Sequence, residues 1–298
     1  MSAAAQPASV GQRIRRWEGL PYWLVLPTLA YLVLFFGWPM VEAFTLAFRE
    51  EGVWSLDAFE RMYDDLRFGE ALKTTLILIG VIVPLQFALA VAMALLVNGR
   101  LRARGLFLYI FLLPLAISDL AAGIVWSSIF TERGYLNTIL QHLGIGDPNL
   151  PRIWLDPTDQ TTLLGTVVVA EIWRSTALIM IILVAGLQSI PKEFNEAAEV
   201  FGAGFWQRLR TVTLPMLKPS IQVALLLRVI LAFEVFATVI AIAGEGTTVL
   251  AAEAYRWETT NQDENVAAAY ASLILVLSVV SALIVLRLLR TKKEQLLR

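Results

Sequence analysis

The amino-acid sequence predicts an all-α membrane protein that crosses the bilayer six times. Of its 298 residues, 57% are hydrophobic and 16% are charged, whereas a soluble domain carries about a quarter charged residues. A spanning helix needs about 20 mostly apolar residues, and six stretches are long enough. None of them shows the alternation of a barrel strand, so we expect helices throughout.

The spans divide the chain into four parts. The predicted spans cover residues 22–48, 71–98, 105–130, 162–188, 219–243 and 266–289. We therefore expect an N-terminal tail (1–20), a first transmembrane anchor helix (21–48), a core of five transmembrane helices (71–290) that contains a long loop (189–218), and a C-terminal tail (291–298). The turn-rich loop 131–161 is expected to hold one short helix at 135–143.

The basic residues orient the chain in the membrane. They cluster before the first span, between spans two and three, between spans four and five, and at the C-terminal end. The other three loops are acidic or mixed; the first of them, residues 49–70, is the most acidic. By the positive-inside rule, both termini and the loop 189–218 face the cytoplasm, and the protein is a multi-pass component of the plasma (inner) membrane.

Composition excludes several kinds of site. The chain has no cysteine and a single histidine, His142, in a predicted loop, so we expect no metal site and no catalytic residue. It contains no GxxxxGK[ST] phosphate-binding loop. No basic footprint for nucleic acid is present.

The loop 189–218 contains the most specific pattern. Residues 196–215 read EAAEVFGAGFWQRLRTVTLP: E-A-A, three residues, G, nine residues, an aliphatic residue, any residue, then L-P. This spacing resembles the EAA loop of ABC importer permeases, with Val212 in the usual place of Ile. An apolar stripe at helical spacing, Phe194, Ala197, Phe201 and Phe205, accompanies it.

The resemblance extends over about residues 72–289 and is nearest to permeases of the carbohydrate-uptake (maltose/trehalose-type) family. The residues that carry it are Pro114, Trp126, Gly134 and Asn137 in and after the third span, and Leu187, Gln188, Ile190 and Pro191 after the fourth. It implies the type I ABC importer permease architecture and a disaccharide, with trehalose expected, as the substrate.

The same resemblance implies the partners. These are a second homologous permease, two copies of an ATP-binding subunit, an extracytoplasmic sugar-binding (lipo)protein and membrane lipid. ATP and Mg would bind the ATPase, so no cofactor is expected on this chain. The residues expected to couple transport to the ATPase are Glu196, Ala197, Ala198, Phe201, Gly202, Leu214 and Pro215. A membrane-surface helix is the alternative interpretation of this segment.

Charged residues inside the spans are costly, at least about 2.5 kcal/mol each on insertion scales, and usually face a cavity or one another. The candidate substrate path consists of Asp119, Trp173, Arg174, Arg228 and Glu234. Glu171 and Arg174 lie three residues apart and can pair, and Gln86 is a neutral companion. For Asp119, Arg228 and Glu234 a structural ion pair with the neighbouring subunit is an equal alternative, and Trp126 is expected to serve as an interface anchor or in packing.

Two other functions compete. A self-sufficient secondary carrier or channel for small polar solutes would show inverted repeats and broken helices around an ion site, and the sequence predicts neither. A membrane-embedded enzyme would need clustered catalytic residues, whereas the charges here are scattered singly.

Overall fold

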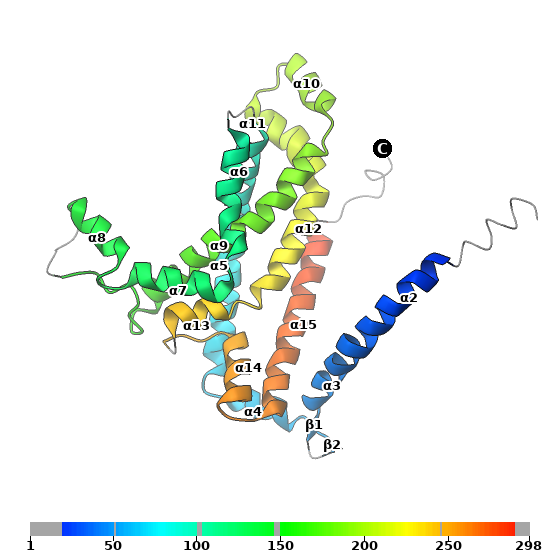
Figure 1. Ribbon diagram of the computed structural model, residues 1–298, viewed down its shortest axis with the longest axis vertical. Helices are drawn as coiled ribbons and strands as arrows, with labels where there is room; N and C mark the ends of the chain where they lie inside the picture. Colours follow the sequence, from blue (N-terminus) through cyan, green and yellow to red (C-terminus); the bar gives the residue numbers. More distant parts are fainter. Residues whose placement is uncertain (1–19, 51, 100–102, 146–149, 245, 290–298) are drawn as a thin grey trace, which may run out of the picture.

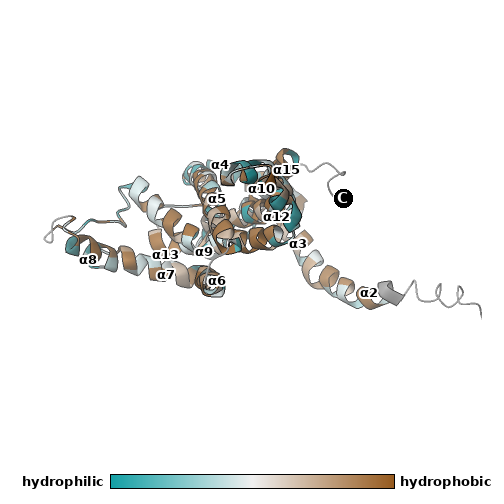
Figure 2. Cartoon of the chain, turned by 90° about the horizontal axis from the view of Figure 1, so that it is seen from above, coloured by the Kyte–Doolittle hydropathy of each residue, from teal (hydrophilic) through white to brown (hydrophobic). Residues whose placement is uncertain are grey.

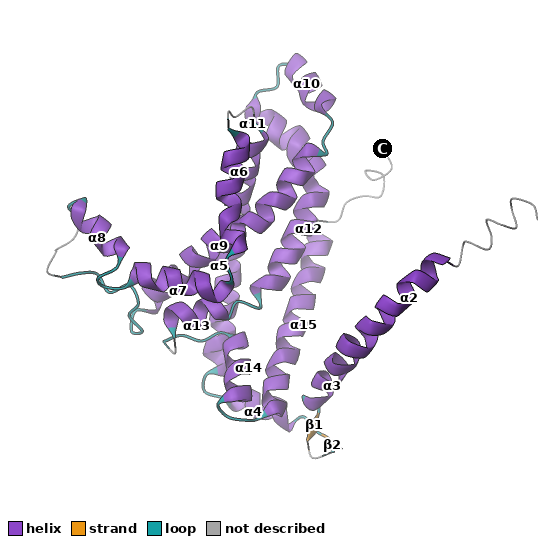
Figure 3. Cartoon of the chain, viewed as in Figure 1, coloured by secondary structure: helices purple, strands orange, loops and turns teal. Residues whose placement is uncertain are grey.

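A computed structural model describes residues 20–50, 52–99, 103–145, 150–244 and 246–289. Within them the chain is helical apart from one two-stranded hairpin (Figures 1 and 3). The predicted tails at 1–19 and 291–298 lie outside the described residues. Five helices of the described chain are long and apolar enough to cross a membrane, and a bent pair makes a sixth span if it counts as one. The predicted all-α membrane fold is therefore confirmed.

Four long helices and one shorter one form the bundle. They are α5 (Phe68–Asn98), α6 (Arg104–Leu112), α9 (Gln160–Gln188), α12 (Leu214–Ala232) and α15 (Glu264–Leu288). Helix α9 is the most deeply buried span and packs against α5 and α12. Small residues on α5, Ala90 and Ala94, let these helices approach closely around Met180 and Leu183 of α9.

The first span stands apart from this bundle (Figure 1). It consists of α2 (Leu20–Leu32), a π-helical turn η1 (Val33–Gly37) and α3 (Trp38–Leu46). None of its most apolar window is buried, and Figure 2 shows hydrophobic residues along α2. Only the end of the span, where Ala47 is buried, joins a core cluster.

The third predicted span is not one straight helix. Helix α6 runs into a 3-10 turn, η2 (Leu113–Ala116), and the chain then bends by 100° into α7 (Asp119–Phe130). Pro114 cannot donate a backbone hydrogen bond, and the Ser118 hydroxyl accepts one from the Ala121 N–H at 3.3 Å, which starts a new helix. The expected continuous span 105–130 is therefore wrong.

The fifth predicted span, 219–243, is also interrupted. A short helix α11 (Phe205–Arg208) and a π-helical turn η3 (Leu209–Thr213) lead into α12, so the helical run begins well before Pro219. It stops at Ala232, and α13 (Ala237–Ala243) follows four non-helical residues later. No Gly or Pro occurs between Phe233 and Phe236 to signal this break. The predicted bounds of this span are thus wrong: the candidate span runs from Phe205 to Ala232, and α13 lies beyond it.

The two broken spans pack against each other through α7 and α13. Gly123 of α7 makes the contact possible: a Cβ at this position would lie 2.6 Å from the Cβ of Ala241 and 3.2 Å from the Cα of Thr238. Beyond α7, helix α8 (Tyr135–His142) matches the short helix predicted in the following loop. The α7–α8 arm leaves the bundle sideways in Figure 1.

The end of the bundle opposite α10 (Lys192–Val200) is called the hairpin end here. It holds strands β1 (Arg49–Glu50) and β2 (Val53–Trp54), α4 (Asp57–Asp64) and α14 (Leu250–Thr259). The sequence did not predict the hairpin. Met62, Leu250 and Tyr270 share a buried cluster that ties α4 and α14 to α15.

Asp65 is the centre of the polar contacts at the hairpin end. Its carboxylate accepts hydrogen bonds from Arg256 at 2.6 Å, from the Trp257 indole N–H at 2.7 Å and from the Tyr270 hydroxyl at 3.2 Å. Burial acts to raise the pKa of Asp65, but the Arg67 N–H, Trp257 and Arg256 together outweigh it, so the pKa lies below its usual value. The ionised form therefore stabilises the fold.

We expect Asp65→Asn to destabilise the purified protein near neutral pH, because the folded state loses a charge-assisted contact of about 1.5–3 kcal/mol. Since the pKa is lowered on folding, this contribution is complete above the unfolded pKa of about 3.9 and disappears as pH falls through the folded value. Melting temperatures of the wild type and the variant should differ at about pH 7, and the difference should begin to shrink only as the pH falls below about 4. A difference independent of pH would contradict the assignment.

Candidate functional site

Helix α10 projects from the bundle end opposite the hairpin (Figure 1). None of its residues is buried. Phe194 is 51% exposed, and Phe201, directly after the helix, is 90% exposed. A short helix that leaves such apolar side chains in the open has a face without a partner in this chain.

The sharp end of α10 depends on Gly202. The Gly202 N–H donates to the Glu199 carbonyl at 2.9 Å, and the Ala203 N–H donates to the Ala198 carbonyl at 2.9 Å. This is the Schellman pattern, which places the residue after the cap in the left-handed region. Gly202 has φ +77° with open space around its Cα, so the conformation, and not crowding, requires glycine.

The loop then returns into the bundle. An ion pair between Glu199 and Arg208 links α10 to α11, and the π-helical turn η3 carries the chain into α12, where Pro215 occupies the first turn. Leu214 is the first residue of α12. The pattern E-A-A…G…L-P thus spans one structural unit: a short helix, a reversal and the entry into a span.

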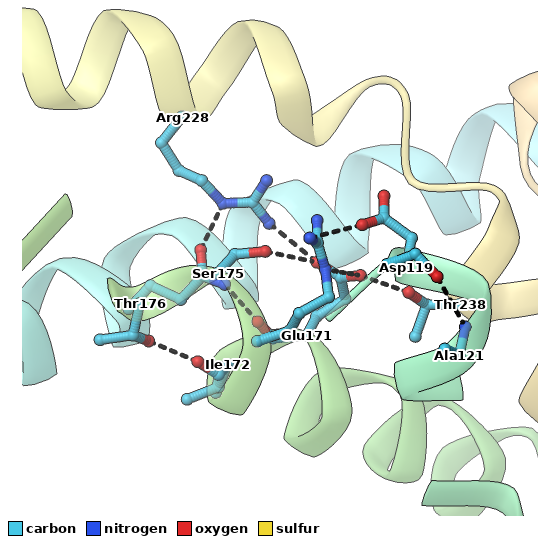
Figure 4. Close-up of polar contacts among 11 residues, drawn as sticks. Asp119, Ala121, Glu171, Ile172, Ser175, Thr176, Arg228 and Thr238 are labelled. Carbon is cyan, nitrogen blue, oxygen red and sulfur yellow. Dashed lines mark hydrogen bonds and ion pairs between the residues drawn. The ribbon is translucent and has the colours of Figure 1, made fainter. Parts of the chain in front are cut away.

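A buried charge pair lies in the interior of the bundle (Figure 4). The Arg228 guanidinium on α12 contacts the Glu171 carboxylate on α9 at 3.2 Å. Both residues are 1% exposed. Arg228 was predicted as part of the path or in an ion pair with the neighbouring subunit; the structure places it inside the helix packing, paired with Glu171 of the same chain.

Neutral groups complete the hydrogen bonds of this pair. Gln86 on α5 accepts from Arg228 and donates to the Glu171 carbonyl at 2.7 Å. The Thr238 hydroxyl on α13 donates to the Glu171 carboxylate at 2.6 Å, and Ser175 does so at 3.3 Å. Three helices, α9, α12 and α13, therefore meet on one carboxylate, and Gln86 joins α5 to them through Arg228 and the Glu171 backbone carbonyl. We call the set Gln86, Glu171, Ser175, Arg228 and Thr238 the carboxylate network.

A second ion pair flanks this network. Arg174 on α9 pairs with Asp119 at the start of α7, and its Nε lies 3.9 Å from the Glu171 carboxylate. The Asp119 side chain is 46% exposed and that of Arg174 is 19% exposed. The pair therefore reaches the surface at the break between α6 and α7. The expected pairing of Glu171 with Arg174 is present as the longer contact.

Aromatic residues lie beside this exposed pair. Trp173 is 38% exposed, and its ring meets the Trp126 ring edge-on at a centroid distance of 5.8 Å. Trp126 stacks on Phe130 in turn. The Trp126 indole N–H is buried and has no hydrogen-bond partner among the described residues. Trp126 thus packs inside the molecule beside Trp173.

Glu234 lies in the other break, between α12 and α13, and is exposed. Its carboxylate forms no ion pair with any residue that the structure describes. The candidate path residues thus fall into two groups: Asp119, Trp173, Arg174 and Glu234 near the broken spans, and Arg228 within the packing. Thr238 was missed because a threonine in an apolar run gives no signal by itself.

Comparison with known proteins identifies the family. Residues 86–294 match the family model described as binding-protein-dependent transport system inner membrane component. The chain is 30% identical to the trehalose/maltose transport system permease protein MalF of Thermococcus litoralis, over 76% of this chain and 78% of the relative. It is 31% identical to the trehalose transport system permease protein SugA of Mycobacterium tuberculosis, over 82% and 78%.

A solved structure shares the architecture. The chain resembles a subunit of a bacterial alginate ABC transporter in complex with an alginate pentasaccharide-bound periplasmic protein, with a TM-score of 0.78 and 25% identity over 94% of this chain and 97% of that subunit. The relatives are transport permeases. The chain belongs to the family of binding-protein-dependent transport system inner membrane components.

Proposed function

We propose that this chain is one of two permease subunits of an ATP-driven importer for a disaccharide, with trehalose as the first candidate. Two relatives are named as trehalose permeases, whereas the structural neighbour imports alginate, so the substrate is the part that most needs a test. The observation that carries the proposal is the unit formed by α10, the Gly202 reversal and the entry into α12.

In this proposal α10 is the coupling helix and seats in a cleft of the ATP-binding subunit. The exposed apolar residues Phe194 and Phe201 would pack there, with Glu196 also exposed on the helix surface. ATP and Mg belong to two copies of that subunit. Residues 201–204 and the Glu199–Arg208 ion pair join α10 to α11, from which η3 and α12 continue, so a movement of α10 would reach the Arg228 helix through them.

The path would run past the two broken spans. A charge exposed to lipid in mid-membrane is costly, so Asp119 and Glu234 are better placed facing water or the second permease. Interrupted helices near the bilayer midplane are common in transporter substrate sites. Trp173 offers a flat apolar surface for a sugar ring, and Asp119 with Arg174 offers hydrogen-bonding groups. Arg228 would hold the helices together without touching the sugar.

A secondary carrier remains the second candidate, because the broken spans expected of that class are present. The family match and the α10 unit favour the ATP-driven importer. Co-purification of the chain with an ATPase distinguishes the two. An external sugar-binding protein is the expected fourth kind of subunit, by analogy with the neighbour's complex.

The first test concerns coupling. Gly202→Asp should abolish uptake while the assembled protein remains at its normal level, because only glycine adopts φ +77° at low cost. Gly204→Asp is the matched control, since Gly204 has extended backbone that any residue adopts. Uptake of radiolabelled disaccharide and substrate-stimulated ATPase activity are the measurements. Normal transport with Gly202→Asp would refute the coupling role.

The second test separates path residues from structural ones. Asp119→Asn and Trp173→Ala should lose uptake at normal complex yield, because Arg174 still has Glu171 nearby. Arg228→Gln should lower the yield, since it leaves Glu171 buried and uncompensated at a cost of about 3–5 kcal/mol. The double variant Arg228→Gln with Glu171→Gln removes both charges and should recover yield. If Asp119→Asn and Trp173→Ala reduce yield in step with uptake, both residues are structural.

The third test concerns orientation. The native chain has no cysteine, so a thiol reagent labels this chain only at the single cysteine that is introduced. Leu66→Cys, at a fully exposed site on the hairpin end, should react with an impermeant thiol reagent added to intact cells, and Gln207→Cys should react only after the cells are opened. Labelling of Gln207→Cys in intact cells would reverse the proposed topology, in which both termini are cytoplasmic.

A further inference from the structure

An apolar cavity lies at the α10 end of the bundle, beside the turn of α11 and η3 that joins α10 to α12. Its volume is about 680 Å³, and it opens between α5 and the turn formed by α11 and η3. The α5 wall includes Ala88, Ala92 and Leu96, which recur at the four-residue spacing of one helix face. The opposite wall consists of Phe205, Trp206 and Leu209. The Trp206 indole N–H is the sole side-chain donor in this lining.

The position of the cavity matches one leaflet of a bilayer. Helix α5 ends at Asn98, and one candidate span begins at Phe205, so the cavity lies at one end of two candidate spans. Ala88 is ten residues from Asn98, a distance of about 15 Å along the helix axis. This is half of the hydrocarbon thickness of about 30 Å. The cavity therefore has the depth of a single acyl layer.

Two basic residues adjoin the lining in the sequence. Arg208 and Arg210 lie on either side of Leu209, which lines the cavity. Arg208 pairs with Glu199, whereas Arg210 is exposed and forms no ion pair within the part of the chain that the structure describes. Trp206 is 69% exposed at the same level, as is usual for tryptophan at a membrane interface.

We propose that this cavity binds one acyl chain of an anionic phospholipid, with the headgroup held by Arg210 and with Trp206 at the interface. Apolar walls, a depth close to that of one leaflet and an exposed arginine next to a lining residue are the features that such a lipid would recognise. The proposal rests on the proposed function in one respect: that function places the α10 end in the cytoplasm, where the leaflet is negatively charged. A segment of the second permease is the competing occupant.

Brominated lipids, which quench tryptophan fluorescence on contact, provide the test. The assembled importer is reconstituted into vesicles of phosphatidylglycerol and phosphatidylcholine in equal amounts, with bromine on the acyl chains of one lipid or of the other. The two vesicle preparations then have the same phospholipid composition and differ only in which lipid carries the bromine. We expect stronger quenching by brominated phosphatidylglycerol, and Trp206→Phe should remove the difference. Trp38→Phe is the matched control, because Trp38 is 71% exposed on the isolated first span and should show no headgroup preference.

Arg210→Gln should keep the acyl contact but bring the quenching by the two lipids to the same level. Absence of a Trp206 contribution in the assembled complex would show that protein covers the cavity and would overturn the proposal. Equal quenching by both lipids in the wild type would overturn the anionic preference. Gly202→Asp should leave the quenching unchanged, so a failure of the coupling assignment and a failure of the lipid site are separable.

Discussion

The structure depends above all on burying the charges of Arg228 and Glu171 between helices without leaving either unpaired. An isolated charge in this setting is expensive, and a single ion pair still leaves lone pairs and donors unsatisfied. Gln86, Ser175 and Thr238 supply those missing hydrogen bonds from α5, α9 and α13. The helices are therefore fixed relative to one another by a polar requirement, while the apolar clusters around Met180 and Leu183 supply most of the buried surface.

This constraint also explains why a broken helix is tolerated here. Helix α13 follows four non-helical residues, yet Thr238 in its first turn bonds the Glu171 carboxylate, and Gly123 lets α7 pack against it closely. The two interrupted spans support each other across this contact. Asp119 at the start of α7 and Glu234 before α13 are exposed, while the Arg228–Glu171 pair is buried. A rigid interior and a polar exposed surface thus meet within one turn of α9, at Glu171 and Arg174.

Much of the fold could be predicted from sequence, because long apolar runs indicate the membrane-spanning segments and the charges of the loops indicate the side of the membrane. The end of α10 at Gly202 was also predictable, since one residue type carries the signal. The breaks were not. Pro114 precedes the first break, but one proline does not fix a bend of 100°, after which α7 packs against α13. The second break, at Phe233–Phe236, has no Gly or Pro. The partners of Arg228 lie 57 and 142 residues away along the chain, beyond what helical spacing can indicate.

The isolation of the first span has a consequence for how its sequence can vary. Because none of its most apolar window packs on the bundle, the bundle places no demand on the shapes of side chains such as Trp23, Leu34 and Phe35. Any selection for particular shapes there comes from lipid or from another subunit. A substitution scan of residues 23–37, before α3 meets α15, would therefore map the neighbours of this protein in the membrane rather than its own folding.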